Sequence, residues 1–327
     1  MLETAFTRLV GCSVPIQLAG MGSILCPELT AAVSEAGALG QITFAGTQPK
    51  VAEARLNRIE ELTSKPFGVN LVIPYFDPAI LRMVIPRARV VDFFWGEPDA
   101  RLIDQVHAGG ALASWQVGSV GEAIDAEKAG CDFIIAQGIE AGGHILGRLT
   151  LLPLLSAVLD AVSVPVLAAG GIGTARSMAA VVFAGAAGAR IGTRFIAAAE
   201  SNAHPDYVRA LIAARAEDAV QTTRFEVDCL MCPAQHRVLR SALEAAEALP
   251  DRPLGEIDIS GERYPIARFQ ATLPTKQVEG KIEAMACYAG QSVGGVRRVQ
   301  PAGEIVAELA GGAETLLARL ATAQVTR

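Results

Sequence analysis

The chain has 327 residues, of which 51% are hydrophobic and 19% charged, and its net charge at neutral pH is −6. This length and apolar content suit one large barrel of strands and helices. The acidic balance argues against a nucleic-acid-binding surface, and no apolar run reaches the roughly 20 residues that a membrane helix needs. Because no basic, hydrophobic leader opens the sequence, we expect a cytoplasmic protein that acts on neither nucleic acid nor membrane.

Eight short apolar segments recur along the first 200 residues and are predicted to be strands. They are apolar at consecutive positions, as are parallel strands that are covered on both faces. Their spacing is mostly about 20 to 30 residues, the length of one strand-plus-helix unit. This rhythm predicts an α/β protein with a closed (β/α)₈ TIM barrel rather than an open doubly wound sheet. The predicted strands are 15–19, 38–44, 67–73, 90–94, 111–117, 131–136, 165–169 and 188–191.

Helices are predicted between these strands, where Ala-rich or amphipathic stretches end before a glycine. The fourth strand is the weakest element, because Asp92 interrupts its apolar run. The predicted helices are 27–36, 51–62, 119–129 and 174–184.

The pattern changes after residue 200. Helices are expected at 202–221, 241–248 and 278–288, with an irregular stretch at 222–237. We interpret 202–290 as a smaller, mostly helical insertion after strand eight, a lid that forms part of the substrate pocket. Residues 1–201 and 291–327 would then form the barrel, closed by a final helix at 302–323.

Two glycine clusters follow the seventh and eighth predicted strands. Gly170 and Gly171 stand in the first cluster, and Gly192 and Thr193 in the second. The loops after these two strands of such a barrel commonly hold a phosphate, which backbone N–H groups and a hydroxyl can bind. The run lacks the spacing of a dinucleotide-binding loop, so a single phosphate is the natural interpretation.

Other strand ends carry glycines and amides. The first strand ends in Gly20, Met21 and Gly22. These residues suit either close contact with a flat aromatic ring or a plain turn. Amides stand on three further strands where apolar packing would be expected, and a polar heterocycle explains three of them better than chance packing does. These amides are Asn70, Gln116 and Gln137.

The sixth strand runs into a glycine-rich turn that holds one of the four histidines. Gly142 and Gly143 permit close backbone approach and positive φ angles. His144 can exchange a proton near neutral pH, although it could equally cap the loop. Because the chain lacks a nucleophile elbow, a zincin helix and a P-loop, this setting predicts chemistry carried by an organic cofactor.

Six cysteines are scattered along the chain, and only Cys229 and Cys232 have a suggestive spacing. His236 lies nearby, but a zinc site needs four ligands and these residues make three. We therefore predict no metal site and expect packing or incidental roles for the cysteines.

Several of these blocks resemble the nitronate monooxygenase family, formerly called 2-nitropropane dioxygenases, whose members depend on FMN. The block ending in Gly-Gly-His is the most specific. The similarity rests on residues 15–21, 67–71, 137–144, 169–172, 192–195 and 288–292.

The resemblance implies an FMN across the barrel mouth and His144 as the active-site histidine. Some members have Lys where this chain has Gln116, so anionic reduced flavin should be less stabilised here. The cofactor contacts implied are Gly20, Met21 and Gly22 beside the isoalloxazine, Asn70 and Gln116 on the ring or ribityl chain, Gln137, Gly142 and Gly143 from the sixth loop, Gly170, Gly171, Gly192 and Thr193 at the phosphate, and Gln291 from a late loop.

The implied activity is oxidation of an alkyl nitronate, or of a neutral nitroalkane, by O2 to a carbonyl compound and nitrite. His144 would position the nitro group or take the α-proton. The alternative within the family is an NAD(P)H-driven reductase acting on a quinone or an enoyl thioester. A flavin-binding protein without turnover and a phosphate-binding barrel aldolase or isomerase are the other hypotheses. The sequence leaves the substrate, the use of NAD(P)H and a homodimeric state open.

Overall fold

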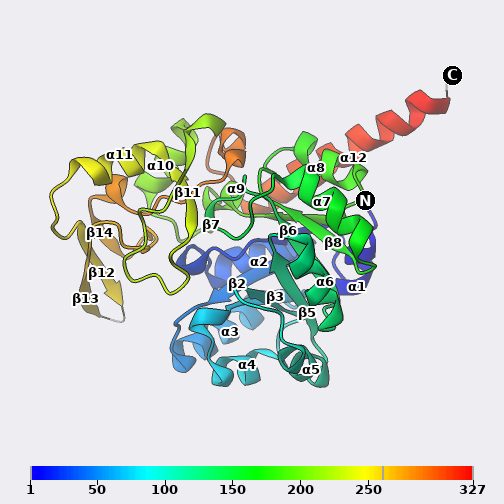
Figure 1. Ribbon diagram of the computed structural model, residues 1–327, viewed down its shortest axis with the longest axis horizontal. Helices are drawn as coiled ribbons and strands as arrows, with labels where there is room; N and C mark the ends of the chain where they lie inside the picture. The colour runs from blue at the N-terminus through cyan, green and yellow to red at the C-terminus, as the bar shows by residue number, and fades with distance from the viewer. Residues whose placement is uncertain (1, 260, 326–327) are drawn as a thin grey trace.

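The structure is a computed structural model that describes residues 2–259 and 261–325. Eight parallel strands form one sheet that curves round a common centre, with helices outside it (Figure 1). Around the barrel their order is β1, β9, β8, β6, β5, β4, β3 and β2. The prediction of a TIM barrel is confirmed. The strands are β1 (Ile16–Leu18), β2 (Gly40–Phe44), β3 (Phe67–Val72), β4 (Val90–Phe94), β5 (Leu112–Val117), β6 (Phe133–Gln137), β8 (Val166–Ala169) and β9 (Gly188–Ile191).

The first strand closes the barrel. On one side β1 pairs in parallel with β9, with Ile16 opposite Ala189. On the other side the amide of Leu18 donates to the carbonyl of Leu39 at 2.9 Å, and the amide of Leu39 donates to the carbonyl of Ile16 at 2.9 Å. The carboxyl-terminal ends of all eight parallel strands therefore meet at one mouth of the barrel.

The outer helices follow the strands as the sequence predicts. At the start of two of them, the Ser119 and Thr174 hydroxyls accept hydrogen bonds from backbone amides, as helix-capping residues do. The last helix, α12, packs against α8 and α2, and its end projects away from the barrel (Figure 1). The helices are α1 (Ala5–Val10), α2 (Pro27–Glu35), α3 (Pro49–Leu62), α4 (Pro78–Val84), α5 (Ala100–Ala108), α6 (Val120–Lys128), α7 (Leu151–Ala161), α8 (Ala175–Phe183), α9 (Thr193–Ile196) and α12 (Ala302–Val325).

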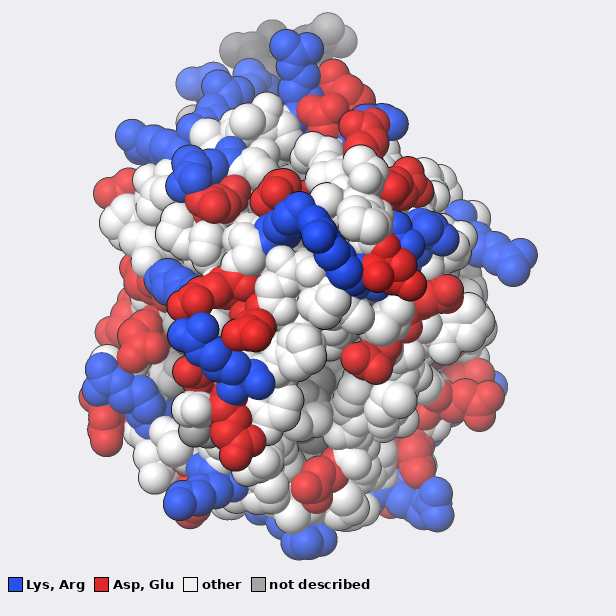
Figure 2. All heavy atoms as spheres, turned by 90° about the vertical axis from the view of Figure 1, so that its left-hand side faces the viewer, with Lys and Arg blue, Asp and Glu red and all other residues white. Residues whose placement is uncertain are grey.

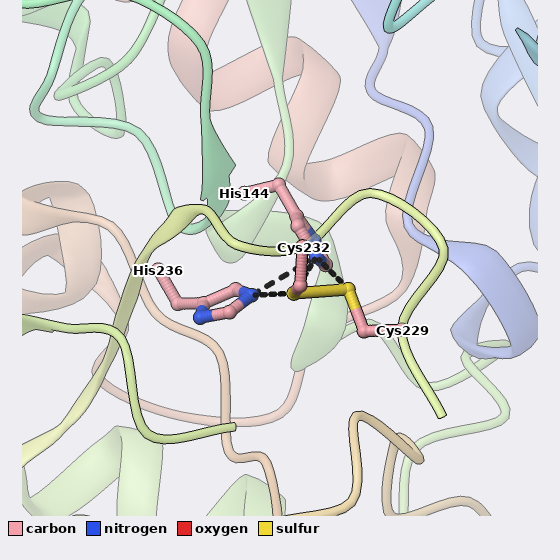
Figure 3. A group of neighbouring side chains, drawn as sticks. All are labelled: His144, Cys229, Cys232 and His236. Carbon is pink, nitrogen blue, oxygen red and sulfur yellow. Dashed lines mark hydrogen bonds between the residues drawn. A yellow bond between two sulfur atoms is a disulfide. The ribbon is translucent and has the colours of Figure 1, made fainter. Parts of the chain in front are cut away.

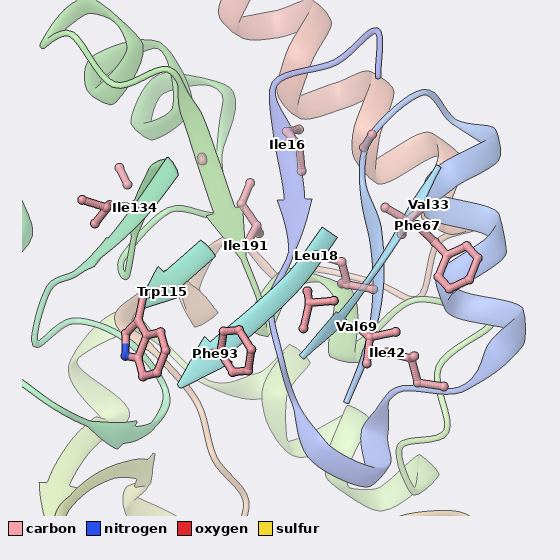
Figure 4. Packing of buried hydrophobic residues seen from close by; sticks show 14 of the residues in the cluster. Ile16, Leu18, Val33, Ile42, Phe67, Val69, Phe93, Trp115, Ile134 and Ile191 are labelled. Carbon is pink, nitrogen blue, oxygen red and sulfur yellow. The ribbon is translucent and has the colours of Figure 1, made fainter. Parts of the chain in front are cut away.

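The main core lies between the strands and the outer helices (Figure 4). Ile42 and Val69 are fully buried there, and the rings of Phe93 and Trp115 stack with centroids 4.9 Å apart. Full burial of such side chains stabilises the fold by roughly 1.5–3 kcal/mol each.

The inner face of the barrel carries a buried polar network. The carboxylate of Asp92 accepts hydrogen bonds from Arg190 (2.6 Å), Asn70 (2.7 Å), Gln41 (3.2 Å) and Ser114 (3.1 Å). Asp92 therefore does not weaken the fourth strand. It points into the barrel while its neighbours Val91 and Phe93 point outward, as alternation along a strand requires.

The insertion is less helical than expected. It holds two α-helices, α10 (Pro205–Ala213) and α11 (Arg240–Ala248), two strands of a small antiparallel sheet shared with the barrel, and a second small antiparallel sheet. The segment 249–274 contains a hairpin that is largely exposed, and the helix expected at 278–288 is instead a short strand and a 3₁₀ turn. One sheet contains β10 (Ala219–Thr222), β11 (Gln235–Leu239) and β7 (Gly143–Ile145), and the other β12 (Gly255–Ile259), β13 (Glu262–Ile266) and β14 (Val278–Gly280).

A second apolar cluster lies under the insertion. It includes Tyr207, Phe225 and Val238, and it reaches Ile24 and Ile196 of the barrel. Acidic and basic side chains alternate over the face that carries the insertion (Figure 2). Within the described residues, no helix has the length and apolar character needed to cross a membrane.

Candidate active site

A cavity of about 340 Å³ opens where the barrel strands end. Its size falls within the usual range for cofactor and ligand sites. Every candidate residue from the sequence except Gln291 lines it. These lining residues are Gly20, Met21, Gly22, Asn70, Gln116, Gln137, Gly142, Gly143, His144, Gly170, Gly171, Gly192 and Thr193.

Gln291 is placed outside the cavity. It is exposed at the start of the 3₁₀ helix η5 (Gln291–Gly295), and its backbone N–H donates to the Glu140 carbonyl at 2.9 Å. Its neighbour Ser292 lines the cavity instead.

The glycines after β8 leave backbone donors unused. Gly170 and Gly171 have φ angles of +104° and +71°. Within the described ranges, neither of their amides donates a hydrogen bond. Two neighbouring N–H groups without partners at a cavity wall form a site suited to an anion.

The loop after β9 closes the same wall of the cavity. A Cβ on Gly192 would lie 3.3 Å from the sulfur of Met21, so this position leaves little space for a side chain. The Thr193 hydroxyl accepts a hydrogen bond from the Gly290 amide at 3.0 Å, which ties the late loop to the barrel.

The side-chain amides of Asn70, Gln137 and Gln116 differ in how many hydrogen bonds they already make within the protein. Asn70 donates to Asp92 and its Oδ1 accepts from Thr43, so it belongs to the inner network. Gln137 donates to the His144 carbonyl and accepts from the Leu146 amide, both at 3.1 Å. The buried Gln116 is the one whose side chain has no hydrogen-bond partner among the described residues.

Arg190 is a cavity residue that sequence reasoning missed. It is 3% exposed, and one guanidinium nitrogen pairs with Asp92 at 2.6 Å. Its Nε and Nη1 are buried with no partner among the described residues. A buried N–H group without a partner is costly, so these atoms suit the oxygen or nitrogen acceptors of a bound ligand. The signal was available, because Arg190 interrupts an apolar strand.

His144 lies at the cavity edge on β7. Its Nε2 is 3.0 Å from Nε2 of His236 and 3.2 Å from Sγ of Cys229. Burial and the neighbouring His236 lower the pKa of His144 to about 3. The ring is therefore neutral at physiological pH and a weak proton acceptor.

Tyr288 presents a second donor at the cavity. Its hydroxyl is buried without a hydrogen-bond partner in the described part of the chain, and burial raises its pKa. The phenol therefore stays protonated and can donate to a ligand. Tyr288 lies in one of the sequence blocks that resemble the family, but the sequence alone predicts no role for it.

Next to His144 lies a cluster of cysteine and histidine side chains (Figure 3). Cys229 and Cys232 form a disulfide beside His236. The local spacing offers three candidate ligands, and the structure adds His144 as a fourth through the pairing of β7 with β11. This pairing joins residues 92 positions apart, which no local spacing reveals.

Comparisons with known proteins agree with this architecture. The family model described as nitronate monooxygenase matches residues 3–80 and 76–312. The chain is 37% identical over 243 residues to a (3aS,4S,5R,7aS)-5-hydroxy-7a-methyl-1-oxo-octahydro-1H-indene-4-carboxyl-CoA dehydrogenase of Rhodococcus jostii, covering 74% of this chain and 67% of that protein. It is 29% identical over 301 residues to a probable nitronate monooxygenase of Staphylococcus aureus, covering 77% and 84%.

Solved structures resemble the whole chain. FabK from Thermotoga maritima superposes with a TM-score of 0.80 at 28% identity, covering 98% of this chain and 99% of that one. A nitroalkane oxidase from Streptomyces ansochromogenes gives a TM-score of 0.77 at 29% identity, covering 96% and 100%. The chain therefore belongs to the nitronate monooxygenase family and is an oxidoreductase.

Proposed function

We propose that the protein is an FMN-dependent nitronate monooxygenase that oxidises alkyl nitronates with O2 to carbonyl compounds and nitrite. The observation that carries this proposal is the cavity at the barrel mouth, where the Gly170 and Gly171 amides, which donate no hydrogen bond within the described residues, meet the Gly192–Thr193 loop. Family membership supports the same reaction class.

The residues present fit FMN. The two free amides, with Gly192 and Thr193, would hold its single phosphate. The Arg190 Nε–H and Nη1–H groups, which have no partner in the described part of the chain, and the side-chain amide of Gln116 are suited to the acceptor atoms of a polar ring. When bound, FMN would supply the two-electron redox chemistry that no side chain of this cavity can provide.

The side chains at the cavity favour a substrate that arrives deprotonated. A base with a pKa near 3 removes a carbon-bound proton poorly, so we propose that His144 positions the nitro group rather than abstracting an α-proton. Tyr288 would donate a second hydrogen bond to the same group from the opposite segment. Nitronates would then react faster than neutral nitroalkanes.

The insertion would act as the wall and lid of the substrate pocket. It contributes Tyr207, Met231, Ala271, Leu273 and Tyr288 to the cavity lining. The division into a barrel (1–201 with 291–327) and a lid (202–290) is part of this proposal. Differences among relatives in this segment would then set the choice of substrate.

The test is an anaerobic reduction experiment on the flavin-loaded protein. Propionate-3-nitronate and NADH or NADPH are added to separate samples while the flavin absorbance is followed. We expect only the nitronate to remove the absorbance, and nitrite to form once O2 is admitted. Rapid loss with NAD(P)H and no reaction with the nitronate would refute the proposal.

A second candidate is an oxidoreductase that acts on an acyl-CoA thioester. The observation in its favour is the name of the 37% identical Rhodococcus relative, a carboxyl-CoA dehydrogenase. Here the donors of His144 and Tyr288 would hold a carbonyl oxygen instead of a nitro group. Flavin reduction by an acyl-CoA, or NAD(P)H-dependent reduction of an enoyl-CoA, would favour this candidate over the first.

A further inference from the structure

Four side chains with soft or borderline ligand atoms converge beside the cavity (Figure 3). They are His144, Cys229, Cys232 and His236, and one ligand atom from each lies within 4.8 Å of all the others. The histidines are direct cross-strand partners in the antiparallel pairing of β7 with β11. The cysteines stand on the loop that leads into β11, so two short strands and one loop organise the whole cluster.

The spacing along the chain is that of a metal site. Cys229, Cys232 and His236 follow the Cys-x₂-Cys-x₃-His pattern, and two-residue gaps between cysteines are typical of structural zinc sites. The fourth ligand comes from a separate segment, which is how such sites clamp two parts of a fold together. Two thiolates with two imidazoles in a tetrahedron are characteristic of zinc.

The distances that involve a nitrogen are close to those around a tetrahedral ion, whereas the two sulfurs are bonded to each other and must separate on reduction. Zn–N bonds of about 2.0–2.1 Å and Zn–S bonds of about 2.3 Å place two nitrogens about 3.3 Å apart and a nitrogen and a sulfur about 3.6 Å apart. Here the two Nε2 atoms are 3.0 Å apart. Three of the four nitrogen–sulfur distances are 3.2, 3.5 and 4.0 Å, and the fourth is within 4.8 Å.

We propose that, once the disulfide between Cys229 and Cys232 is reduced, these four side chains bind one Zn²⁺ in a closed tetrahedral site. A thiol reductant gives the S–S bond two electrons, and two protons complete the thiols. Zinc then displaces both thiol protons as two Zn–S and two Zn–N bonds form. Because protein atoms fill all four positions, the ion would stabilise the fold rather than activate substrate.

A metal here would fix one wall of the cavity. The loop that carries the cysteines also donates a hydrogen bond from the Leu230 amide to the Tyr75 hydroxyl at 2.9 Å, and Met231 lines the cavity. A zinc bond to Nε2 of His144 would leave Nδ1–H as the only donor on that ring. This matches a positioning role toward substrate, but the metal site itself does not depend on the flavin proposal.

The test measures metal uptake by the full chain after anaerobic reduction and removal of bound metal by a chelator. Zinc content is determined after titration with Zn²⁺, and Co²⁺ is added to a second sample as a spectroscopic probe. We expect one metal ion per chain and the absorption bands of tetrahedral cobalt with thiolate ligands. The oxidised protein should bind neither ion.

Single substitutions assign the ligands. Cys229→Ser and His236→Asn should each weaken zinc binding by more than about 100-fold, the upper end of what loss of an outer hydrogen-bond partner costs. Cys12→Ser is the matched control, because Cys12 is half-buried before β1 at the opposite end of the barrel. It should bind zinc like the native chain.

Native protein that gains two reactive thiols on reduction but shows no cobalt–thiolate spectrum would overturn the proposal and leave a simple disulfide couple. This result is decisive even where a variant fails to fold, since it needs only the native chain. Flavin content is measured on the same samples, so that failure of the metal proposal can be distinguished from failure of the proposed flavin-dependent function.

Discussion

Replacing Asp92 with Asn probes the charge balance inside the barrel. The carboxylate is fully buried, and Arg190, its ion-pair partner, is 3% exposed. Asn fills nearly the same space and keeps one acceptor oxygen. It removes the negative charge, however, and leaves the guanidinium buried without compensation.

The expected loss is large for one substitution. Removing one partner of a buried ion pair costs about 3–5 kcal/mol. An unfolding entropy of about 2.1 cal/mol/K per residue gives about 0.7 kcal/mol/K for the whole chain, so the melting temperature should fall by about 4–7 °C. Thermal unfolding followed by circular dichroism, in protein stripped of flavin, measures this shift.

A double-mutant cycle separates the charge from the packing. Arg190→Met alone should also destabilise the protein, because it leaves the carboxylate unpaired, whereas Asp92→Asn with Arg190→Met removes both charges of this pair. The double variant should therefore lose less than the sum of the single losses, with a coupling of about 1–3 kcal/mol. A drop below about 1 °C for Asp92→Asn, or simple additivity, would refute the reasoning.

Two further substitutions test the cavity. Gly171→Ala should weaken FMN binding by about 5- to 30-fold in a fluorescence titration, because positive φ costs a side chain about 1–2 kcal/mol and the new Cβ would lie 3.2 Å from that of Glu140. Gly110→Ala carries the same backbone strain at φ +84° with open space around it, so equal flavin loss in both would contradict the phosphate assignment. Tyr288→Phe should lower turnover of a nitronate by about 100-fold with stability unchanged, since it removes an unpartnered donor. Tyr207→Phe should instead cost about 1 kcal/mol of stability, because that hydroxyl bonds the Tyr288 carbonyl. Native turnover in Tyr288→Phe would remove the residue from the mechanism.

The barrel and most of the cavity lining were predictable because their signals are local. Apolar runs, helix-ending glycines and the loops after strands seven and eight each depend on a few neighbouring residues. Once the strands are parallel and closed, all their ends must meet at one mouth, so Gly20, Gln116 and Gly170 come together without any knowledge of side-chain packing.

The remaining features depend on contacts that sequence spacing does not encode. In the sequence, Asp92 only interrupts an apolar strand. In the structure, its carboxylate pairs with Arg190, which is 98 residues away along the chain. The same holds for His144, which pairs with His236 through a sheet shared between the barrel and the insertion. The hairpin of β12 and β13 is largely exposed, and Ile266 is its one buried strand residue, so the short alternation at 256–259 was too weak a signal to predict a hairpin.

The most direct test of the account is the flavin content of the freshly isolated, untreated protein, together with its uptake of riboflavin 5′-phosphate. We predict a yellow protein with one FMN per chain, or a colourless one that binds FMN tightly when it is added. A folded protein that is colourless and does not take up FMN would contradict it.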